Sequence, residues 1–545
     1  MAGIFLLAYL FTLSCVYESE QVGRLSSVPY YDDVGYFRYG VDISENLHEK
    51  GAYGAIYHLQ HYGAHAPFSE FLAGLTVYFN GYSPKAIYTA NVFVIIIYLC
   101  FLVYFFNSLK TPIQFALLAC FLSLPFATMS VVEFRPDMAW AIWLGFTAIF
   151  VVTRRDYFQK ISPTIWFGLL ISFTLLTKPT TFPMTLMICG LGFSGRLVLE
   201  FFQPSRPSIG NISKRVAVRL LVLLGIITLV AGPYIYFFGR AIWEFFWDNM
   251  FGKQRSLWDS FSHYSWNYYI WGFVFQSNLN YSGLVLICAT FCVLLIYRKR
   301  FNIYDITELA ICFALIFTAL VINSTARVAD VYLGGAFYGT LIFTMAFILG
   351  RHVPGLRHSS TTEAPQLLPQ EVRPVVAGKL SWAKLPECFV GVLLLLCVLT
   401  YRWPPCSSVP VESGRFMRDL HEKLYDYISR APIPSAIFVT QAGPAVLENI
   451  RIWIMLHHQK SEGYSLWRCV SLNDSWALAQ QGDLIIAQNK GFQDATSWLP
   501  AEQWQDVIVD RLKKSSDYRL VFTYPDQNGK ALYIFRRVTT DKSSN

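Results

Sequence analysis

The sequence predicts an α-helical, polytopic membrane protein that ends in a small soluble α/β domain. Its 545 residues are 54% hydrophobic and only 15% charged, with a mean hydropathy of +0.37. Soluble proteins carry about 25% charged residues, so most of this chain belongs in a lipid bilayer. About eleven apolar runs follow one another along the chain, and the composition becomes polar only after Trp403.

Each apolar run is long enough to cross a bilayer, or nearly so. The predicted spans together form a membrane domain over residues 1–402, and they cover residues 1–17, 86–106, 112–131, 137–152, 163–177, 181–195, 217–238, 281–297, 308–323, 331–350 and 388–402. No internal repeat relates one group of spans to another. This argues against a transporter built from duplicated halves.

Basic residues indicate which side of the membrane each loop faces. They cluster near residues 110, 154–160, 196–219, 298–300 and 351–384. Loops rich in Lys and Arg stay in the cytoplasm, so residues 351–387 are predicted to be a cytoplasmic linker. The first loop, residues 18–85, then faces the extracytoplasmic side, and an odd number of spans sends the C-terminal domain there too. The net charge of +8 reflects this topology, and nucleic acid is not an expected partner.

The C-terminal domain, residues 403–545, alternates helical and strand patterns. We expect helices at 412–429, 445–459 and 501–513, and strands at 436–440, 483–487, 518–523 and 531–537. It has no phosphate-binding glycine loop and no nucleophile elbow, which favours a packing or acceptor-positioning role. Cys406 and Cys469 could form a disulfide if this domain faces an oxidising compartment.

Two adjacent carboxylates, Asp32 and Asp33, follow the first span. Aromatic residues surround them in Tyr30–Gly40. Like charges disfavour each other's ionisation, so one member of such a pair can have a raised pKa and act as a base near neutral pH. The commoner role of two consecutive Asp residues is an acidic helix cap. The neighbouring residues must therefore decide between the two roles.

Further ionisable residues lie at the predicted outer ends of spans, where they tend to mark function. They are Glu133, Arg135, Asp137, Lys178 and Arg327. Arg and Lys at such places suit an anionic phosphate, and carboxylates suit proton abstraction or cation binding. Two alternatives stay open: Arg135 and Asp137 could simply pair with each other, and Lys178 could be an interface anchor.

Three histidines of the first loop could in principle hold a metal. However, His58, His61 and His65 have irregular spacing and aromatic surroundings, which favour packing at the membrane interface. No Cys/His spacing resembles a structural zinc site. We assign no metal ligands, and the need for a divalent metal stays an open question.

Several short motifs resemble those of the GT-C glycosyltransferases, which are polytopic enzymes that use polyprenyl-phosphate sugars. The family includes protein O-mannosyltransferases and the lipid A aminoarabinose transferase. This chain resembles the first-loop signature of the family at Asp32-Asp33, Phe37-Arg38-Tyr39-Gly40, Asn46-Leu47 and Gly51-Ala52-Tyr53-Gly54. It resembles the family's His-Pro-Pro motif at His65-Ala66-Pro67 and the Arg-Pro-Asp motif at Arg135-Pro136-Asp137. It resembles the phosphate-side Lys motif at Leu176-Thr177-Lys178-Pro179. Some members carry an Arg three residues after the first acid, where this chain has Gly35, so Arg38 is the possible substitute.

The resemblance implies transfer of a sugar, with inversion, from a polyprenyl-phosphate donor to an acceptor hydroxyl at the extracytoplasmic face. The acceptor would be a lipid, a glycan or a protein. Asp32 is then the general base, and Asp33 positions the acceptor or a cation. The resemblance further implies that the substrates are bound by Arg38, His65, Arg135, Asp137, Lys178 and Arg327.

Two other functions remain as alternatives. A transporter or flippase of polysaccharide or lipid would carry ionisable residues in the middle of its spans. An inactive GT-C-like scaffold would use its C-terminal domain to bind a partner. The enzyme requires that Asp32, Asp33, Asp137 and Lys178 converge on one cavity that is open to the bilayer.

Overall fold

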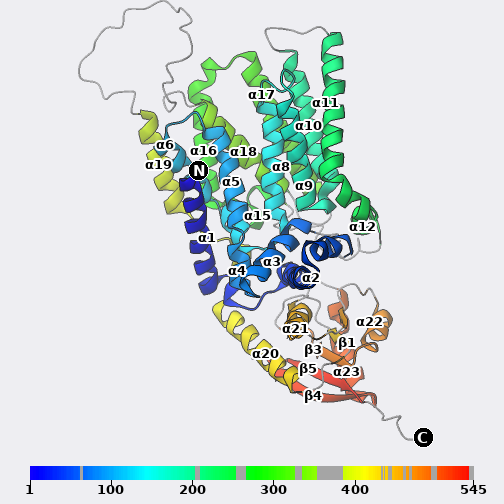
Figure 1. The fold of residues 1–545 in the computed structure, drawn as a ribbon. Helices are drawn as coiled ribbons and strands as arrows, with labels where there is room; N and C mark the ends of the chain where they lie inside the picture. The colour runs from blue at the N-terminus through cyan, green and yellow to red at the C-terminus, as the bar shows by residue number, and fades with distance from the viewer. Residues whose placement is uncertain are drawn as a thin grey trace, which may run out of the picture.

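The computed structural model is a bundle of helices, with further helices lying across one end and a small α/β domain beyond them (Figure 1). We call the end that these further helices cover the α2 end, after the longest of them. The structure describes all residues except 62–65, 203–208, 253–265, 326–333, 353–384, 431–433, 435, 440–444, 458, 460–461, 466–468, 470, 493–499 and 539–545.

The apolar runs form the long helices of the bundle. They are α1 (Ala2–Val22), α5 (Val92–Phe106), α6 (Thr111–Leu122), α7 (Pro125–Val132), α8 (Pro136–Thr153), α9 (Ser162–Thr177), α10 (Phe182–Glu200), α11 (Ile209–Val230), α12 (Gly232–Met250), α16 (Asn280–Tyr297), α17 (Ile303–Thr325), α18 (Gly335–His352) and α19 (Leu385–Thr400). By length and apolar composition, 6 described helices can cross a membrane, or up to 9 if each bent pair is one span. The chain is therefore an integral, multi-pass membrane protein.

This number is smaller than the eleven or so spans that we expected. The expected span 112–131 is broken into α6 and α7, which are bent by 69°, because Pro125 cannot continue a helix. The expected span 217–238 bends by 76° where α11 gives way to α12, whose second residue is Pro233. Helix α9 is too short to count as a span, with only 16 residues, and α18 does not meet the test of length and apolar composition.

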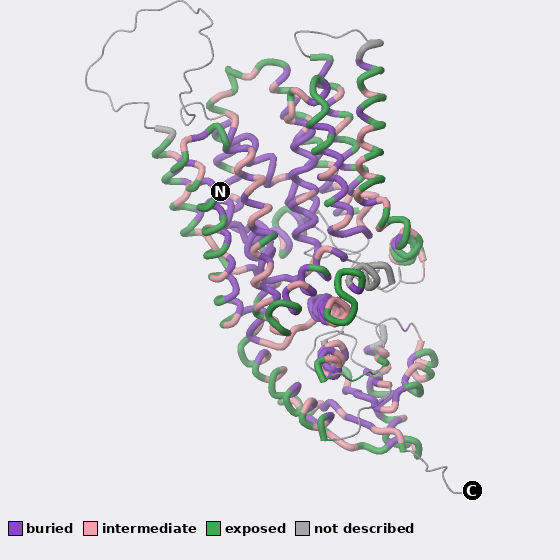
Figure 2. Tube along the Cα trace, in the orientation of Figure 1, coloured by how far each residue is buried: buried purple, intermediate pink, exposed green. Residues whose placement is uncertain are grey.

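Helix α18 is almost wholly buried and packs along α8. Gly145 and Gly339 permit this, because a Cβ on Gly145 would lie 2.4 Å from the Gly339 backbone. Figure 2 shows the contrast between this buried interior and the exposed outer faces of helices such as α11. Leu221 and Leu229 of α11 are 70% and 77% exposed, as expected for side chains that face lipid tails.

The predicted first loop, residues 18–85, is mostly helical. It contains η1 (Arg24–Ser26), α2 (Tyr31–His61), α3 (Pro67–Asn80) and the start of the next span, α4 (Pro84–Thr89). Helices α2 and α3 pack closely, since a Cβ on Gly40 would lie 2.6 Å from the Cβ of Ala73. Gly51, with φ of 62°, kinks α2. The charged residues of the first loop are thus placed on a packed helical layer.

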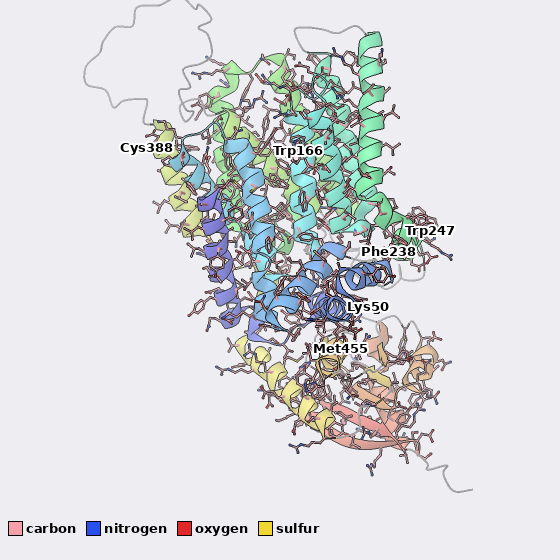
Figure 3. All side chains as sticks on the ribbon, in the orientation of Figure 1. Lys50, Trp166, Phe238, Trp247, Cys388 and Met455 are labelled. Atoms are coloured by element: carbon pink, nitrogen blue, oxygen red, sulfur yellow. The ribbon has the colours of Figure 1, made fainter. Side chains whose placement is uncertain are left out.

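The aromatic-rich residues 239–280, which lie between two of the predicted spans, are also largely helical where they are described. Helix α12 continues to Met250, and α14 (Trp266–Ile270) and α15 (Phe273–Asn278) follow. Trp243 and Trp247 stack on one face of α12, with ring centroids 5.8 Å apart. Figure 3 shows Trp247 on the outer side of the molecule. This placement fits an aromatic belt at a membrane interface.

The C-terminal α/β domain has one five-stranded sheet, with strand order β2-β1-β3-β5-β4. Strands β1 to β3 are parallel to one another, and β5 is antiparallel to β3 and β4. The strands are β1 (Ala436–Val439), β2 (Glu462–Ser465), β3 (Leu484–Gln488), β4 (Tyr518–Pro525) and β5 (Ala531–Arg537). The helices are α20 (Val411–Ser429), α21 (Ala445–Leu456), α22 (Leu472–Ala479) and α23 (Gln505–Lys514), which follows η11 (Pro500–Trp504). The sequence did not predict β2 or α22.

Cys406 and Cys469 are both free thiols. Cys406, in η8 (Pro405–Ser407), has its Sγ 3.6 Å from the Sδ of Met129 in the bundle. Cys469 belongs to the hydrophobic core of the C-terminal domain. The two thiols lie in different cores, so the disulfide considered from the sequence does not form.

The C-terminal domain docks onto the helical layer at the α2 end. Glu448 of α21 forms an ion pair with Arg38, whose Nε lies 2.6 Å from the carboxylate. Asn449 donates a hydrogen bond from its side-chain amide to the Pro29 carbonyl at 2.6 Å. Gly414 of α20 touches the Ser26 backbone, where a Cβ would be 2.6 Å from the carbonyl oxygen. The domain is therefore in contact with the layer that carries Asp32 and Asp33.

Candidate functional site

Asp32 and Asp33 both lie in the first turn of α2, where carboxylates interact favourably with the helix dipole. Their environments differ sharply. The Asp32 side chain is 57% exposed, and that of Asp33 is 0% exposed. Consecutive helical residues point about 100° apart, so two adjacent carboxylates can face solvent and core respectively.

Asp33 belongs to a buried ionic network. Arg24 of η1 contacts Asp33 Oδ2 with Nη1 at 3.3 Å and Glu133 with its other terminal nitrogen. Tyr88 donates its hydroxyl to Asp33 at 2.5 Å, and Ser407 donates to Glu133 at 2.8 Å. Burial raises the pKa of Glu133, and Arg24 opposes that effect. This network joins α2 to α4, η1, η8 and the α7–α8 turn.

Asp32 pairs instead with Arg135, the residue that precedes α8. The distance from Arg135 Nη1 to Asp32 Oδ2 is 3.4 Å, and the Arg135 side chain is 11% exposed. Asp137, in the first turn of α8, pairs with Lys178 at the end of α9. Arg135 and Asp137 were considered as partners of each other. In the structure, each pairs instead with a residue of an element distant in sequence, Arg135 with Asp32 and Asp137 with Lys178.

Tyr36 of α2 lies among these charges. Burial raises the pKa of Tyr36 well above its ordinary value, and Asp32, Asp137 and Glu70 add to the effect while Arg135 opposes it. Arg135 and Asp137 are two residues apart in the chain, so the two ion pairs lie next to each other. Three aromatic rings brace this arrangement: Phe37 packs edge-on against Tyr88 at 5.4 Å and against Phe134 at 5.3 Å. The sequence-predicted residues Asp32, Arg135, Asp137 and Lys178 therefore gather at the α2 end.

Glu70 of α3 is a member of this region that the sequence did not reveal. Its side chain is fully buried, and neither carboxyl oxygen has a hydrogen-bond partner in the described structure. Burial raises the pKa of Glu70 to about 8, and the positive charge of Arg38 opposes this shift only in part. Only its burial distinguishes this residue, because a single Glu near a helix start is an ordinary sequence feature.

Replacing Glu70 by glutamine is expected to remove a pH-dependent loss of stability. Between about pH 4.5 and 8 the folded chain keeps a proton that the unfolded chain releases, so stability falls as pH rises through this range. The glutamine variant lacks this cost, which is at most about 5 kcal/mol. The glutamine variant and the native protein would be melted in one detergent at pH 5, 7 and 9. The difference between their melting temperatures should grow as the pH rises. Glu49→Gln, at an exposed position of α2, is the control, and equal pH slopes for all three proteins would contradict the assignment.

Arg38 does not join the other predicted site residues. It contacts Asp42 at 3.2 Å and Glu448 at 2.6 Å, and its side chain is 12% exposed. Its place is the contact between α2 and the C-terminal domain. His65 and Arg327 lie outside the described residues, as do the side chains of His58 and His61. Among the described residues, no group of three or more His, Cys, Asp or Glu is arranged to hold a metal ion.

Among the solved structures that match this chain, two are covered over almost their whole length as well as its own. ArnT from Cupriavidus metallidurans bound to undecaprenyl phosphate matches with a TM-score of 0.58 and 10% identity, covering 98% of both chains. The same protein in the apo state matches with a TM-score of 0.56 and 12% identity, again over 98% of both chains. The chain has the GT-C fold. No protein-family model matches the sequence, and no curated protein matches it either.

The hairpin of α2 and α3 covers the bundle where α8 begins and α9 ends (Figure 1). The Asp32–Arg135 pair joins this hairpin to the bundle, and the Asp137–Lys178 pair joins α8 to the end of α9 within the bundle. An archaeal oligosaccharyltransferase from Archaeoglobus fulgidus, in complex with Zn and sulfate, also matches at 11% identity over 97% of this chain and 72% of its own. Its TM-score of 0.42 is below the level of a shared fold.

Proposed function

We propose that this chain is a glycosyltransferase that moves a sugar from a polyprenyl-phosphate donor to an acceptor hydroxyl. The observation that carries the proposal is that the ion pairs Asp32–Arg135 and Asp137–Lys178 lie next to each other at the α2 end of a GT-C bundle, since Arg135 and Asp137 are two residues apart. These residues supply a solvent-reachable carboxylate beside two largely buried cations. The match to a structure that holds undecaprenyl phosphate supports a lipid phosphate as the donor's carrier.

In the proposed reaction, Asp32 takes the proton of the acceptor hydroxyl as its oxygen attacks the anomeric carbon. The new carbon–oxygen bond forms while the bond from that carbon to the lipid phosphate breaks, and the phosphate leaves with the electron pair. Attack from the opposite face inverts the anomeric centre. Lys178 and Arg135 stabilise the charge on the departing phosphate, and Asp137 orients Lys178.

Asp33 acts in this proposal as a positioning residue. Its contacts with Arg24 and Tyr88 hold the first turn of α2, and thereby hold Asp32 beside Arg135. Arg38 positions the C-terminal domain against α2 through Glu448. His65 and Arg327 would complete the substrate-binding set.

The α2 end is proposed to be extracytoplasmic, because the opposite end carries most of the Lys and Arg residues of the bundle. In this orientation, residues 1–402 form the catalytic membrane domain, residues 351–387 a cytoplasmic linker, and residues 403–545 an extracytoplasmic domain. The docking of that domain beside Asp32 supports a role in positioning the acceptor, whether it is a lipid, a glycan or a protein.

Mass spectrometry of membranes with and without this protein tests the proposed function. The expected result is a glycan, glycolipid or glycoprotein that lacks one sugar when the protein is absent, and that returns with the intact chain but not with Asp32→Asn. Identical glycan profiles in the two membranes would exclude the transferase. A polysaccharide that is complete but retained on the wrong side of the membrane would indicate a transporter instead.

Replacing Lys178 by glutamine is expected to weaken binding of undecaprenyl phosphate by about 10- to 100-fold, the equivalent of one charge-assisted hydrogen bond. Binding would be titrated with the purified protein in detergent. Because Asp137 loses its partner, the double variant Lys178→Gln/Asp137→Asn keeps the local charge balanced and should bind as weakly. Lys85→Gln, at an exposed position of the same end, is the matched control. Unchanged affinity in the Lys178 variants would make Lys178 a structural residue only.

A further inference from the structure

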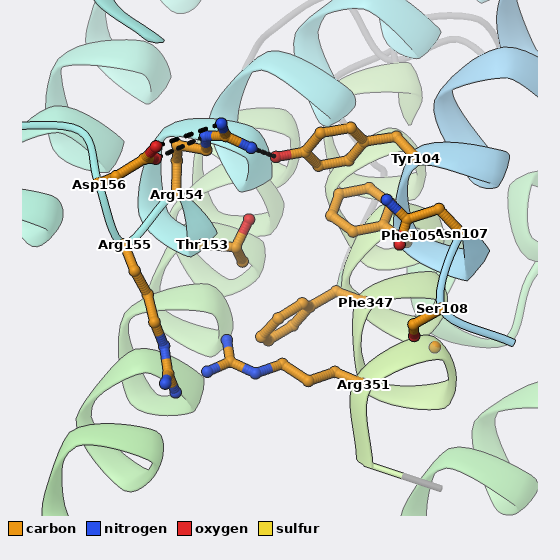
Figure 4. Close-up of a pocket in the computed structure, with 11 residues that line it drawn as sticks. Tyr104, Phe105, Asn107, Ser108, Thr153, Arg154, Arg155, Asp156, Phe347 and Arg351 are labelled. Atoms are coloured by element: carbon orange, nitrogen blue, oxygen red, sulfur yellow. Dashed lines mark hydrogen bonds and ion pairs between the residues drawn. The ribbon is translucent and has the colours of Figure 1, made fainter. Parts of the chain in front are cut away.

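A second polar site lies at the end of the bundle opposite α2. Helices α5, α8 and α18 end there and line an open pocket of about 480 Å³ (Figure 4). Three arginines and one carboxylate line it, namely Arg154, Arg155, Arg351 and Asp156. Tyr104, Asn107, Ser108 and Thr153 add hydroxyl and amide groups.

The pocket is remote from the proposed transferase site. Asp137 lies in the first turn of α8 and Thr153 at its end, 16 residues further on, so the two sites are about 24 Å apart. Two helices that qualify as membrane spans, Pro84–Phe106 and Pro136–Thr153, stop at the pocket. The pocket therefore lies where the apolar part of the bundle ends, at the depth of the lipid headgroups.

The arginines are held in place by acidic partners beside or behind the pocket. Arg154 contacts Asp156 at 2.7 Å and Tyr104 at 3.4 Å. Arg155 and Arg351 both contact Asp305 Oδ1, at 2.9 and 3.5 Å, so their guanidinium groups approach each other. Each guanidinium carries five N–H donors, and can therefore hold a carboxylate on one edge and a phosphate on another.

The acidic partners neutralise part of the charge of these arginines, but the end of the bundle as a whole carries an excess of positive charge that favours an anion. Described basic residues at this end of the bundle clearly outnumber the acidic ones, which are Asp156, Glu200, Asp305, Glu308 and Glu387. The basic residues are Lys110, Arg154, Arg155, Lys160, Arg196, Lys214, Arg215, Arg219, Arg298, Lys299, Arg300 and Arg351. Helix C-termini attract cations, which explains why arginines lie at this end of the helices. The helix dipole does not explain why three of these arginines line one pocket.

We propose that this pocket binds the phosphate group of an anionic ligand, either the headgroup of a membrane phospholipid or free phosphate. Arg154 and Arg155, which are 38% and 56% exposed, receive the phosphate from the membrane surface. The exposed part of the pocket wall, Asn107 and Ser108, contacts the rest of the ligand. The site is independent of Asp32 and would exist whether or not the chain transfers sugars.

The test measures ligand binding to the purified full-length protein. Native mass spectrometry and thermal unfolding would compare phosphatidylglycerol, phosphatidylcholine and inorganic phosphate, with chloride as the salt control. We expect retention of phosphatidylglycerol over phosphatidylcholine, and at least a 10-fold loss of affinity in Arg154→Gln. Arg298→Gln, at an exposed arginine of the same end outside the pocket lining, should bind as the native protein does.

A second variant distinguishes a loss of binding from a loss of folding. Asn107→Trp places a bulky ring in the pocket from an exposed turn and removes no ion pair. It should abolish binding while leaving the melting temperature of the ligand-free protein unchanged. Stabilisation by phosphatidylglycerol alone identifies a lipid headgroup, and stabilisation by phosphate as well identifies a phosphate site open to water. Equal binding by the native protein, Arg154→Gln and Asn107→Trp, or no preference for phosphatidylglycerol or phosphate, would overturn the proposal.

Discussion

Asp32→Asn is expected to lower sugar transfer by about 10²- to 10⁴-fold, which is the usual contribution of a general base. Asparagine keeps the size of the side chain but cannot accept the acceptor's proton. The fold should remain intact, because the 57% exposed Asp32 makes a partly solvated pair with Arg135. Such pairs contribute at most about 1 kcal/mol to stability.

Three measurements on the Asp32 variant separate catalysis from binding and folding. The glycan product is quantified by mass spectrometry of membranes, undecaprenyl phosphate binding by titration, and the melting temperature in detergent. We expect loss of the product with the other two values nearly unchanged. Transfer at the native rate would remove Asp32 from the mechanism, whereas lost donor binding would make it a binding residue.

Asp33→Asn is expected to have the opposite phenotype, a loss of stability of about 3–5 kcal/mol. The substitution leaves Arg24 buried with one carboxylate fewer, and also weakens the bond from Tyr88. Buried ion pairs are costly to break from one side, since the remaining charge loses its compensation. Thermal unfolding, or the half-life of the folded protein at a fixed temperature, measures the effect.

The adjacent variants serve as each other's control, because they make the same chemical change one residue apart. If Asp33→Asn were as stable as the native protein but inactive, Asp33 would act directly on substrate and the buried network would not explain its role. If both variants unfolded equally, the distinction between an exposed and a buried carboxylate would be wrong.

Much of the fold was predictable from patterns within short segments. Apolar runs predicted helices at the places where α5, α8, α10, α16 and α17 lie, and strand patterns after Trp403 predicted β1, β3, β4 and β5. Strand β2 escaped prediction because its four residues, Glu462–Ser465, are short and polar, and are ordered by parallel pairing with β1. The broken spans were missed because hydropathy does not register the bend that Pro125 introduces.

The candidate site was only partly predictable. Charged residues at the ends of apolar runs identified Asp32, Arg135, Asp137 and Lys178, but not which of them pair. Glu70 was missed because its burial depends on how α3 packs against α2. Arg38 forms an ion pair with Glu448, a partner more than four hundred residues further along the chain that no local pattern indicates.

The sequence by itself determined that this chain crosses a membrane, that a small α/β domain follows the spans, and that an acidic pair stands just after the first one. These properties depend on composition and local order. Only the tertiary structure decided that Asp32 reaches solvent beside Arg135 while Asp33 is buried against Arg24. The reason is physical: two neighbouring residues on a helix face different directions, and the partners in each direction come from distant parts of the chain.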